Sequence, residues 1–305
     1  MRASVRAFLS GLIDYAGLFP PAKLPLDEAI RNYARYRTEP ESWMLGRFVI
    51  PATRLAELEP HAHLFSSGPP APFAVLGRGA DTAPAFVKGI ADDVEAVARF
   101  RARHGASALV DNYEVKLPAG ALPGRDTNIW LQAPAKGLQR IGLSAVYEVP
   151  AAAPAELFRR MRGGAAGVKL RCGGLEPAAF PGPEQVAAVI AACRDNGLAL
   201  KFTAGLHHPI RHFDRGVRAT MHGFLNVFAA GILAHALRLG EGQLREIIED
   251  EDASRFQFDE EWFGWRQFHV TTDQVAAARR QFVVSFGSCS FDEPRDDLRA
   301  LGILT

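Results

Sequence analysis

The sequence predicts an α/β fold, a (β/α)8 TIM barrel in which eight parallel strands, each followed by a helix, close into a ring. Short apolar strands alternate along the chain with turns and with helical segments rich in Ala, Leu and Arg, an order that indicates a parallel sheet. Eight such units fill about 250 residues, the usual length of this barrel. The alternative is an open, doubly wound sheet, but no GxGxxG motif follows the first strand.

The expected strands are short and mostly apolar, and turns or glycines separate them from the helices. In chain order they are Arg47–Pro51, Phe73–Leu76, Leu109–Leu117, Ser144–Val149, Gly167–Arg171, Leu198–Thr203, Gly223–Phe228 and Arg255–Phe258.

The expected helices are Asp92–His104, Pro154–Arg162, Pro183–Asn196 and Gln243–Asp250. The first begins with acidic residues and ends with basic ones, as the helix dipole favours. "RDNG" at 194–197 places a glycine directly after the third helix, where helices commonly end. "NIWLQAP" at 128–134 lies too close to the third strand for a parallel crossover, so we place it in the helix that follows that strand.

We expect residues 1–305 to form a single domain. Residues 1–40 form an N-terminal helical extension, 41–285 the barrel, and 286–305 a short C-terminal tail. The extension contains a Pro-Pro turn and a helix from Leu26, and the tail contains a helix that begins near Pro294. Asp14 and Tyr15 either cap the barrel or reach its site, and the sequence leaves both roles open.

Composition and charge exclude several classes of protein. The formal net charge is +1 and charges of both signs are mixed along the chain, which argues against a nucleic-acid or membrane-surface protein. No apolar run reaches the roughly 20 residues of a membrane span. Three distant cysteines without a CxxC motif fit a cytoplasmic enzyme with reduced thiols. We expect a small-molecule substrate, no nucleic acid or membrane as partner, and a possible homo-oligomer.

Alternation of side chains along the strands directs polar residues into the barrel, because the apolar positions between them face the helices. These polar residues are Glu114, Lys116, Glu148, Lys169, Arg171, Lys201, Thr203 and Asn226. Such a cluster is costly in a core but typical of the C-terminal mouth of the barrel, where active sites lie. Gly173 and Gly205 follow the strands that carry the two inner lysines, and glycine there lets the backbone approach a ligand.

The two inner lysines are the candidates for chemistry. Only six of the 35 basic residues are lysines, so a lysine inside the barrel suggests a role that arginine cannot fill. Lys169 and Lys201 lie on neighbouring strands, and an amine beside a second cation in a partly apolar pocket has a lowered pKa. It can then condense with a carbonyl compound to a Schiff base near neutral pH.

The remaining polar residues suggest supporting roles. Glu148 or Glu114 can shuttle protons, and His207 or His208, in the loop after the Lys201 strand, can act as acid or base near pH 7. Arg171 and the glycine turns can hold a carboxylate or phosphate. Thr203, Asn226 and Lys116 are further candidates for binding the substrate.

This layout resembles the class I (Schiff-base) aldolases, through "GVKLR" at 167–171 and "LKFTAG" at 200–205. In these (β/α)8 enzymes a lysine, often on strand six, forms the imine and a second lysine nearby tunes it. The resemblance implies a lyase of the aldolase type that needs no cofactor. With the strands counted as above, Lys201 lies on strand six and is the expected imine-forming lysine, and Lys169 is its neighbour.

Two other classes stay open. A metal-dependent barrel lyase or hydrolase would bind a divalent cation through His207, His208 and a carboxylate such as Glu148. A non-catalytic protein that binds small anions would need the cations but no reactive amine.

Overall fold

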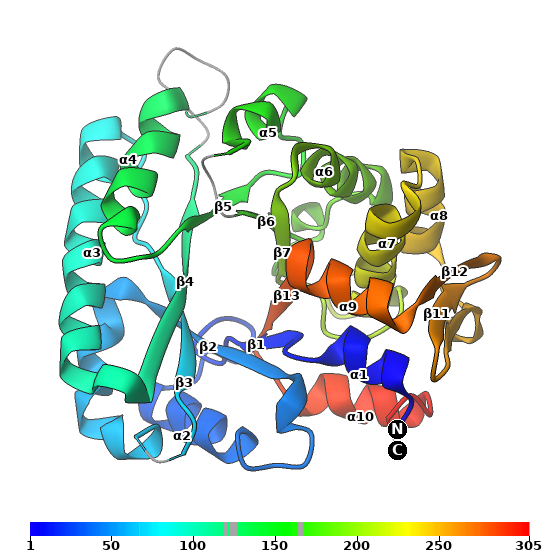
Figure 1. Cartoon of the computed structure of the whole chain (residues 1–305), viewed down its shortest axis with the longest axis horizontal. Coiled ribbons are helices and arrows are strands. Elements are labelled where there is room, and N and C mark those ends of the chain that lie inside the picture. Colours follow the sequence, from blue (N-terminus) through cyan, green and yellow to red (C-terminus); the bar gives the residue numbers. More distant parts are fainter. Residues whose placement is uncertain (67, 119–120, 122–126, 164–166, 305) are drawn as a thin grey trace.

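The computed structural model shows the predicted closed barrel at the centre of the molecule (Figure 1). It describes residues 1–304 except 67, 119–120, 122–126 and 164–166. The strands are parallel, and their order around the barrel is β1-β13-β7-β6-β5-β4-β3-β2. Their bounds are β1 (Ile13–Tyr15), β2 (Leu45–Pro51), β3 (Ala71–Leu76), β4 (Ala108–Lys116), β5 (Ala145–Val149), β6 (Gly167–Arg171), β7 (Ala199–Thr203) and β13 (Val283–Ser288).

Six of the expected strands are barrel strands, and two are not. The segment expected as Gly223–Phe228 belongs to a helix, α7 (Phe224–Leu237), in which residues 224–234 are all buried. A fully buried helix and a fully buried strand both appear in the sequence as a continuous apolar run, so the length of the run is the main feature that distinguishes a helix from a strand. The segment expected as Arg255–Phe258 contains β10 (Phe256–Phe258), which pairs outside the barrel with β11 (Trp262–Trp265) and, through it, β12 (Phe268–Thr271).

The two barrel strands that replace them come from the ends of the chain. β1 and β13 pair in parallel, with Asp14 opposite Gly287, so the barrel extends from residue 13 to residue 288 and not from 41 to 285. β1 has three residues, too few to show a period. β13 contains a register shift between Val283 and Phe286 that interrupts its alternation.

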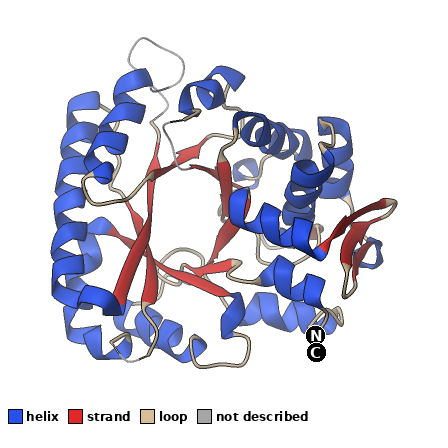
Figure 2. Ribbon diagram, viewed as in Figure 1, coloured by secondary structure: helices blue, strands red, loops and turns tan. Residues whose placement is uncertain are grey.

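Helices surround the barrel (Figure 2). They are α1 (Ala3–Leu9), α2 (Leu26–Tyr36), α3 (Ala83–His104), α4 (Thr127–Gln139), α5 (Ala155–Met161), α6 (Pro183–Asn196), α7, α8 (Glu241–Glu249), α9 (Thr272–Gln281) and α10 (Asp292–Ala300), with a long 3-10 segment at Ala52–Leu64. Of these, α8 packs on the outside of α6 and α7. The helical placement of "NIWLQAP" is confirmed, since it lies within α4. A hairpin, β8 (His212–Asp214) and β9 (Ala219–Met221), follows β7. Among the described residues, no helix is long and apolar enough to span a membrane.

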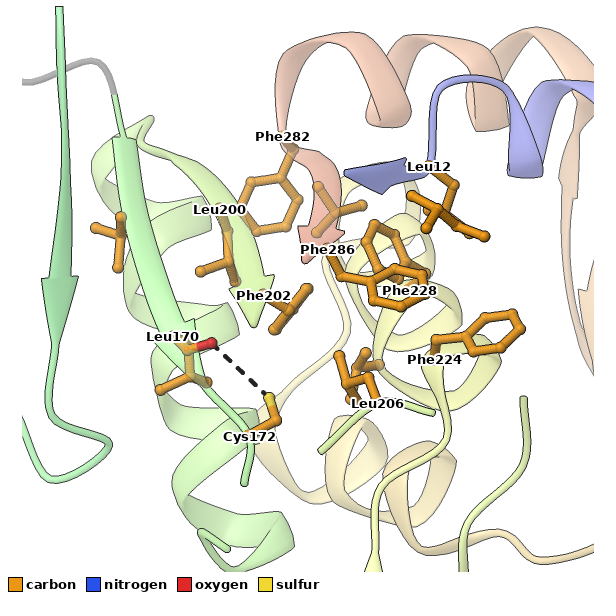
Figure 3. Close-up of a cluster of buried hydrophobic side chains, with 14 of the residues drawn as sticks. Leu12, Leu170, Cys172, Leu200, Phe202, Leu206, Phe224, Phe228, Phe282 and Phe286 are labelled. Atoms are coloured by element: carbon orange, nitrogen blue, oxygen red, sulfur yellow. Dashed lines mark hydrogen bonds between the residues drawn. The ribbon is translucent and has the colours of Figure 1, made fainter. Parts of the chain in front are cut away.

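The apolar side chains on the outward face of the strands pack against the helices and form the hydrophobic core. The opposite, polar face of the strands therefore points into the barrel. Figure 3 shows Phe202 and Phe286 directed toward α7, where Phe224 and Phe228 meet them, and Leu170 is buried in the same core on β6. The Phe224 and Phe286 rings stack with centroids 5.2 Å apart, and those of Phe202 and Phe228 meet edge-on at 5.3 Å. Burying one such ring contributes about 1.5–3 kcal/mol. Because strand side chains alternate, this packing directs Lys169 and Lys201 into the barrel.

Candidate active site at the C-terminal mouth of the barrel

Strand register places four charged residues in one row. Lys116 pairs with Glu148, Glu148 with Lys169, and Lys169 with Lys201 across β4, β5, β6 and β7. Lys169 and Lys201 are therefore neighbours at the same height, and both are buried, with 6% and 2% of their surface exposed. Because β1 is a barrel strand that the sequence did not predict, each later strand moves up by one in the count. Lys169 therefore lies on the sixth strand of the barrel, β6, and Lys201 on the seventh, β7.

Glu114 lies between the two lysines and binds both. Its Oε2 accepts a hydrogen bond from Lys169 Nζ at 2.7 Å, and its Oε1 accepts one from Lys201 Nζ at 2.5 Å. Lys169 Nζ also contacts Glu148 Oε2 at 2.9 Å. The lysines thus form a chain of alternating charges across the barrel and do not face each other as an isolated pair of cations.

Asp14 continues this chain on the first strand. Lys201 Nζ donates to Asp14 Oδ2 at 2.5 Å, and the Ser285 hydroxyl donates to the same oxygen at 2.8 Å. The backbone N–H of Arg47 donates to Asp14 Oδ1 at 2.7 Å. The sequence left open whether Asp14 caps the barrel or reaches its site. Its contact with Lys201 places it inside the barrel, next to the site. Ser285 was missed because its strand was not predicted.

The carboxylates determine how the lysines ionise. Burial alone would raise the pKa of Glu114, but Lys169 and Lys201 outweigh it and hold the pKa at about 2. Burial alone would lower the pKa of Lys169, but Glu114 and Glu148 outweigh it and raise the pKa above its ordinary value. The expectation of a lowered lysine pKa is therefore wrong for Lys169, because the nearest charges to its amine are negative.

A cavity of about 230 Å³ opens above these groups at the carboxyl ends of the strands. Both lysines line it, together with Glu114, Glu148, Arg171, Thr203, Gly205 and His207. The N-terminal loop contributes Phe19, Pro20 and Pro21, and the turn after β13 contributes Ser288 and Cys289. These extensions therefore supply one wall of the cavity.

The two glycines named from the sequence serve a packing role. A Cβ on Gly173 would lie 2.7 Å from the Cα of Gly205, so only glycine allows the two turns to approach this closely. Gly205 also has a φ of +69°, which favours glycine. Gly205 lines the cavity, and on the other turn Gly174 does so.

His207 and His208 bind different acids on α10. His207 Nδ1 lies 3.2 Å from Glu293 Oε2, and His208 Nδ1 lies 2.6 Å from Asp297 Oδ2. Hydrogen bonds of His207 with Cys289 and with Glu293 raise its pKa to about 9, against the effect of burial. His207 is therefore a cation at the cavity wall near neutral pH. Cys289, half-buried in the same wall, is a neighbour that the strand pattern did not indicate.

Asn226 is not part of the site. It lies on α7, where its amide nitrogen donates to the carbonyls of Ile247 and Asp250 and its oxygen accepts from the Arg211 backbone N–H. Its role is to hold the segment directly before the β8–β9 hairpin and the end of α8 against α7. The prediction failed because it assumed a strand at this position.

The ligand set of the metal alternative is not brought together. His207 and His208 engage Glu293 and Asp297, while Glu148 engages Lys169. Within the described part of the chain, no group of three or more His, Cys, Asp or Glu side chains is arranged to hold a metal ion.

Comparison with known proteins does not place the chain in a family. No protein-family model matches the chain, and no curated protein matches it. Twelve chains of solved structures match. One, described as a dihydrodipicolinate synthase family protein from Coccidioides immitis, has a TM-score of 0.35 and 17% identity over 79% of this chain and 76% of that chain. This likeness assigns no family and no activity to the present chain.

Proposed function

We propose that the protein is a lyase of the aldolase type that forms a Schiff base between a buried lysine and a small carbonyl substrate. The observation that carries this proposal is the pair Lys169 and Lys201, which share Glu114 and line one cavity. A core that needed only packing would not contain five ionisable groups in contact, since removing each from water is costly.

Lys169 is the better candidate for the imine. Lys201 is held between Glu114 and Asp14, whose side chains are 2% and 0% exposed. Lys169 contacts Glu148, whose side chain is 14% exposed and lines the mouth. Lys169 also lies on the sixth strand of the barrel, the position that the aldolase resemblance favours.

The chemistry follows from these contacts. Glu148 accepts a proton from the Lys169 ammonium, and the free amine attacks the substrate carbonyl carbon. One amine proton moves to the substrate oxygen to give the carbinolamine, and Glu148 returns its proton to the same oxygen, which leaves as water while the C=N bond forms. The iminium then accepts the electron pair of the carbon–carbon bond that breaks, giving an enamine, while the hydroxyl on the departing carbon gives its proton to Glu148 and becomes the carbonyl of the released fragment. Lys201 stays bound to Asp14 and Glu114, and its charge keeps Glu114 ionised.

Borohydride reduction tests the proposal. The protein is incubated with pyruvate or glyceraldehyde, reduced, and weighed by intact-mass spectrometry. We expect a stoichiometric adduct in the wild type, none in Lys169→Arg, because a guanidinium cannot form an imine, and a slower adduct in Lys201→Arg. Lys88→Arg, with an exposed side chain on α3, is the control. An unmodified wild type, or a Lys169→Arg variant modified as fast as wild type, contradicts the proposal.

A further inference from the structure

A second and larger cavity adjoins the one over the lysines. It has a volume of about 1130 Å³ and lies at the carboxyl ends of β3, β4, β5 and β6. Glu148 and Arg171 line both cavities, so the two meet along this shared wall. The inner cavity, at about 230 Å³, is below the 300–1,000 Å³ usual for a ligand site. A substrate larger than the inner cavity would extend across the wall into the outer one.

The outer cavity carries cations that no internal acid neutralises. Arg78 is engaged by Asp93, with 2.8 Å between Arg78 Nε and Asp93 Oδ1. Lys116 and Arg171 are exposed, and among the described residues neither has an acidic partner. Two carboxylates line this cavity, Asp81 and Glu148. Among the described residues, Asp81 forms no ion pair, whereas Glu148 pairs with Lys169. With Glu148 bound to Lys169, the cavity retains a net positive charge.

Register gives the distance between these cations and the reactive amine. Lys116 lies in the same row as Lys169, two strands away through Glu148, which corresponds to roughly 10 Å between backbones. Arg171 lies two residues beyond Lys169 on the same face of β6, at the boundary between the cavities. The rest of the outer wall is apolar, formed by residues that include Val149, Pro150 and Phe180.

We infer that the outer cavity binds an anionic group, a carboxylate or a phosphate, at the far end of the substrate from the carbonyl carbon. Lys116 binds that group, Arg171 binds it or the chain next to it, and the apolar wall contacts the chain. This inference rests on the proposed Schiff-base function for the carbonyl end of the substrate. It assigns to Lys116 a role in choosing the substrate and none in forming the imine.

Matched pairs of carbonyl compounds test the inference by borohydride trapping. Each pair differs in the terminal anion: 2-oxoadipate against 2-oxohexanoate for a carboxylate, and glyceraldehyde 3-phosphate against glyceraldehyde for a phosphate. We expect the anionic member of at least one pair to half-saturate trapping at a concentration about tenfold lower, as one charge-assisted contact provides. The pair that shows the preference identifies the anion.

Lys116→Met, which keeps the length of the side chain and removes its charge, should abolish most of that preference. Lys136→Met, at an exposed position on α4, should retain it. The absence of a preference in the wild type, or an equal preference in Lys116→Met, overturns the inference.

A binding measurement separates failure of the inference from failure of the proposed function. Glutarate and inorganic phosphate carry no reactive carbonyl, and their binding is measured by calorimetry. We expect at least one of them to bind the wild type several-fold more tightly than Lys116→Met, whether or not an imine forms. Equal binding to the two proteins, or no binding, overturns the inference even if trapping succeeds.

Discussion

Lys201 Nζ lies 2.5 Å from Asp14 Oδ2, and this contact joins the seventh strand of the barrel to the first across 187 residues of chain. Asp14 is fully buried, and the Ser285 hydroxyl on β13, the strand between β1 and β7, binds the same oxygen. The contact therefore links three strands at the place where the barrel closes. Removing either charge leaves the other buried with one ionic partner fewer, since Lys201 then keeps only Glu114 and Asp14 only the more distant Arg47 guanidinium.

Asp14→Asn should lower the free energy of unfolding by about 3–5 kcal/mol, the usual cost of removing one partner of a buried ion pair. Urea unfolding at neutral pH measures this change. Asp111→Asn is the matched control, because Asp111 pairs with Arg47 but its side chain is 35% exposed. There the loss should be below about 1 kcal/mol. Equal losses in the two variants would show that the Asp14 contact contributes no more than a surface ion pair.

Acid should weaken the fold through Glu114. Its pKa is lowered from 4.5 to about 2 in the folded chain, so the unfolded chain takes up this proton first as pH falls. The stabilisation is fully present above about pH 4.5 and is lost as pH falls toward 2, and it amounts to roughly 3 kcal/mol. Glu114→Gln removes the titrating group. Unfolding free energies of the wild type and this variant should converge as pH falls from about 6 to 2, and a constant difference would contradict the prediction.

Glu114→Gln should also move the pH dependence of imine formation. Glu114 and Glu148 raise the pKa of Lys169, so the amine is scarce at neutral pH and the trapping rate in the wild type should rise with pH above 7. With the Glu114 charge removed, the rise should begin at lower pH. The profile is measured as trapping rate against pH with pyruvate. A wild-type rate that is already constant near neutral pH would show that the Lys169 pKa is not raised.

His207 should titrate near pH 9, which nuclear magnetic resonance of its ring protons can measure. Cys289→Ala and Glu293→Gln should each lower this pKa toward 6.5, because each removes a hydrogen bond that favours the imidazolium. Asp297→Asn is the control, since Asp297 binds His208, and it should leave His207 nearly unchanged. A pKa near 6.5 in the wild type would show that neither contact persists in solution.

The sequence was sufficient for the fold class, for six of the barrel strands and for the direction of the two inner lysines. The strands that carry Lys169 and Lys201 alternate cleanly between apolar and polar residues, and the alternation predicted their direction correctly. β1 is too short to show a period and β13 contains a register shift, so Asp14 stayed ambiguous and Ser285 was missed. Asn226 was misplaced because a buried helix and a buried strand share the same composition.

The ionisation of the lysines could not be predicted in the same way. The sequence places two amines on adjacent strands, which suggests mutual repulsion. It does not show that Glu114, 55 residues before Lys169, has one carboxylate oxygen directed at each amine. The sign of the Lys169 pKa shift depends on that contact, and the contact depends on register around the whole barrel.

The most direct test of the central claim is to locate the borohydride-reduced adduct by peptide mapping after trapping with pyruvate. The account predicts modification of Lys169, within the peptide that contains residues 167–171, and none at exposed lysines such as Lys88. An adduct confined to exposed lysines, or no adduct at any pH from about 7 to 9, over which the fraction of unprotonated Lys169 amine rises, would contradict it.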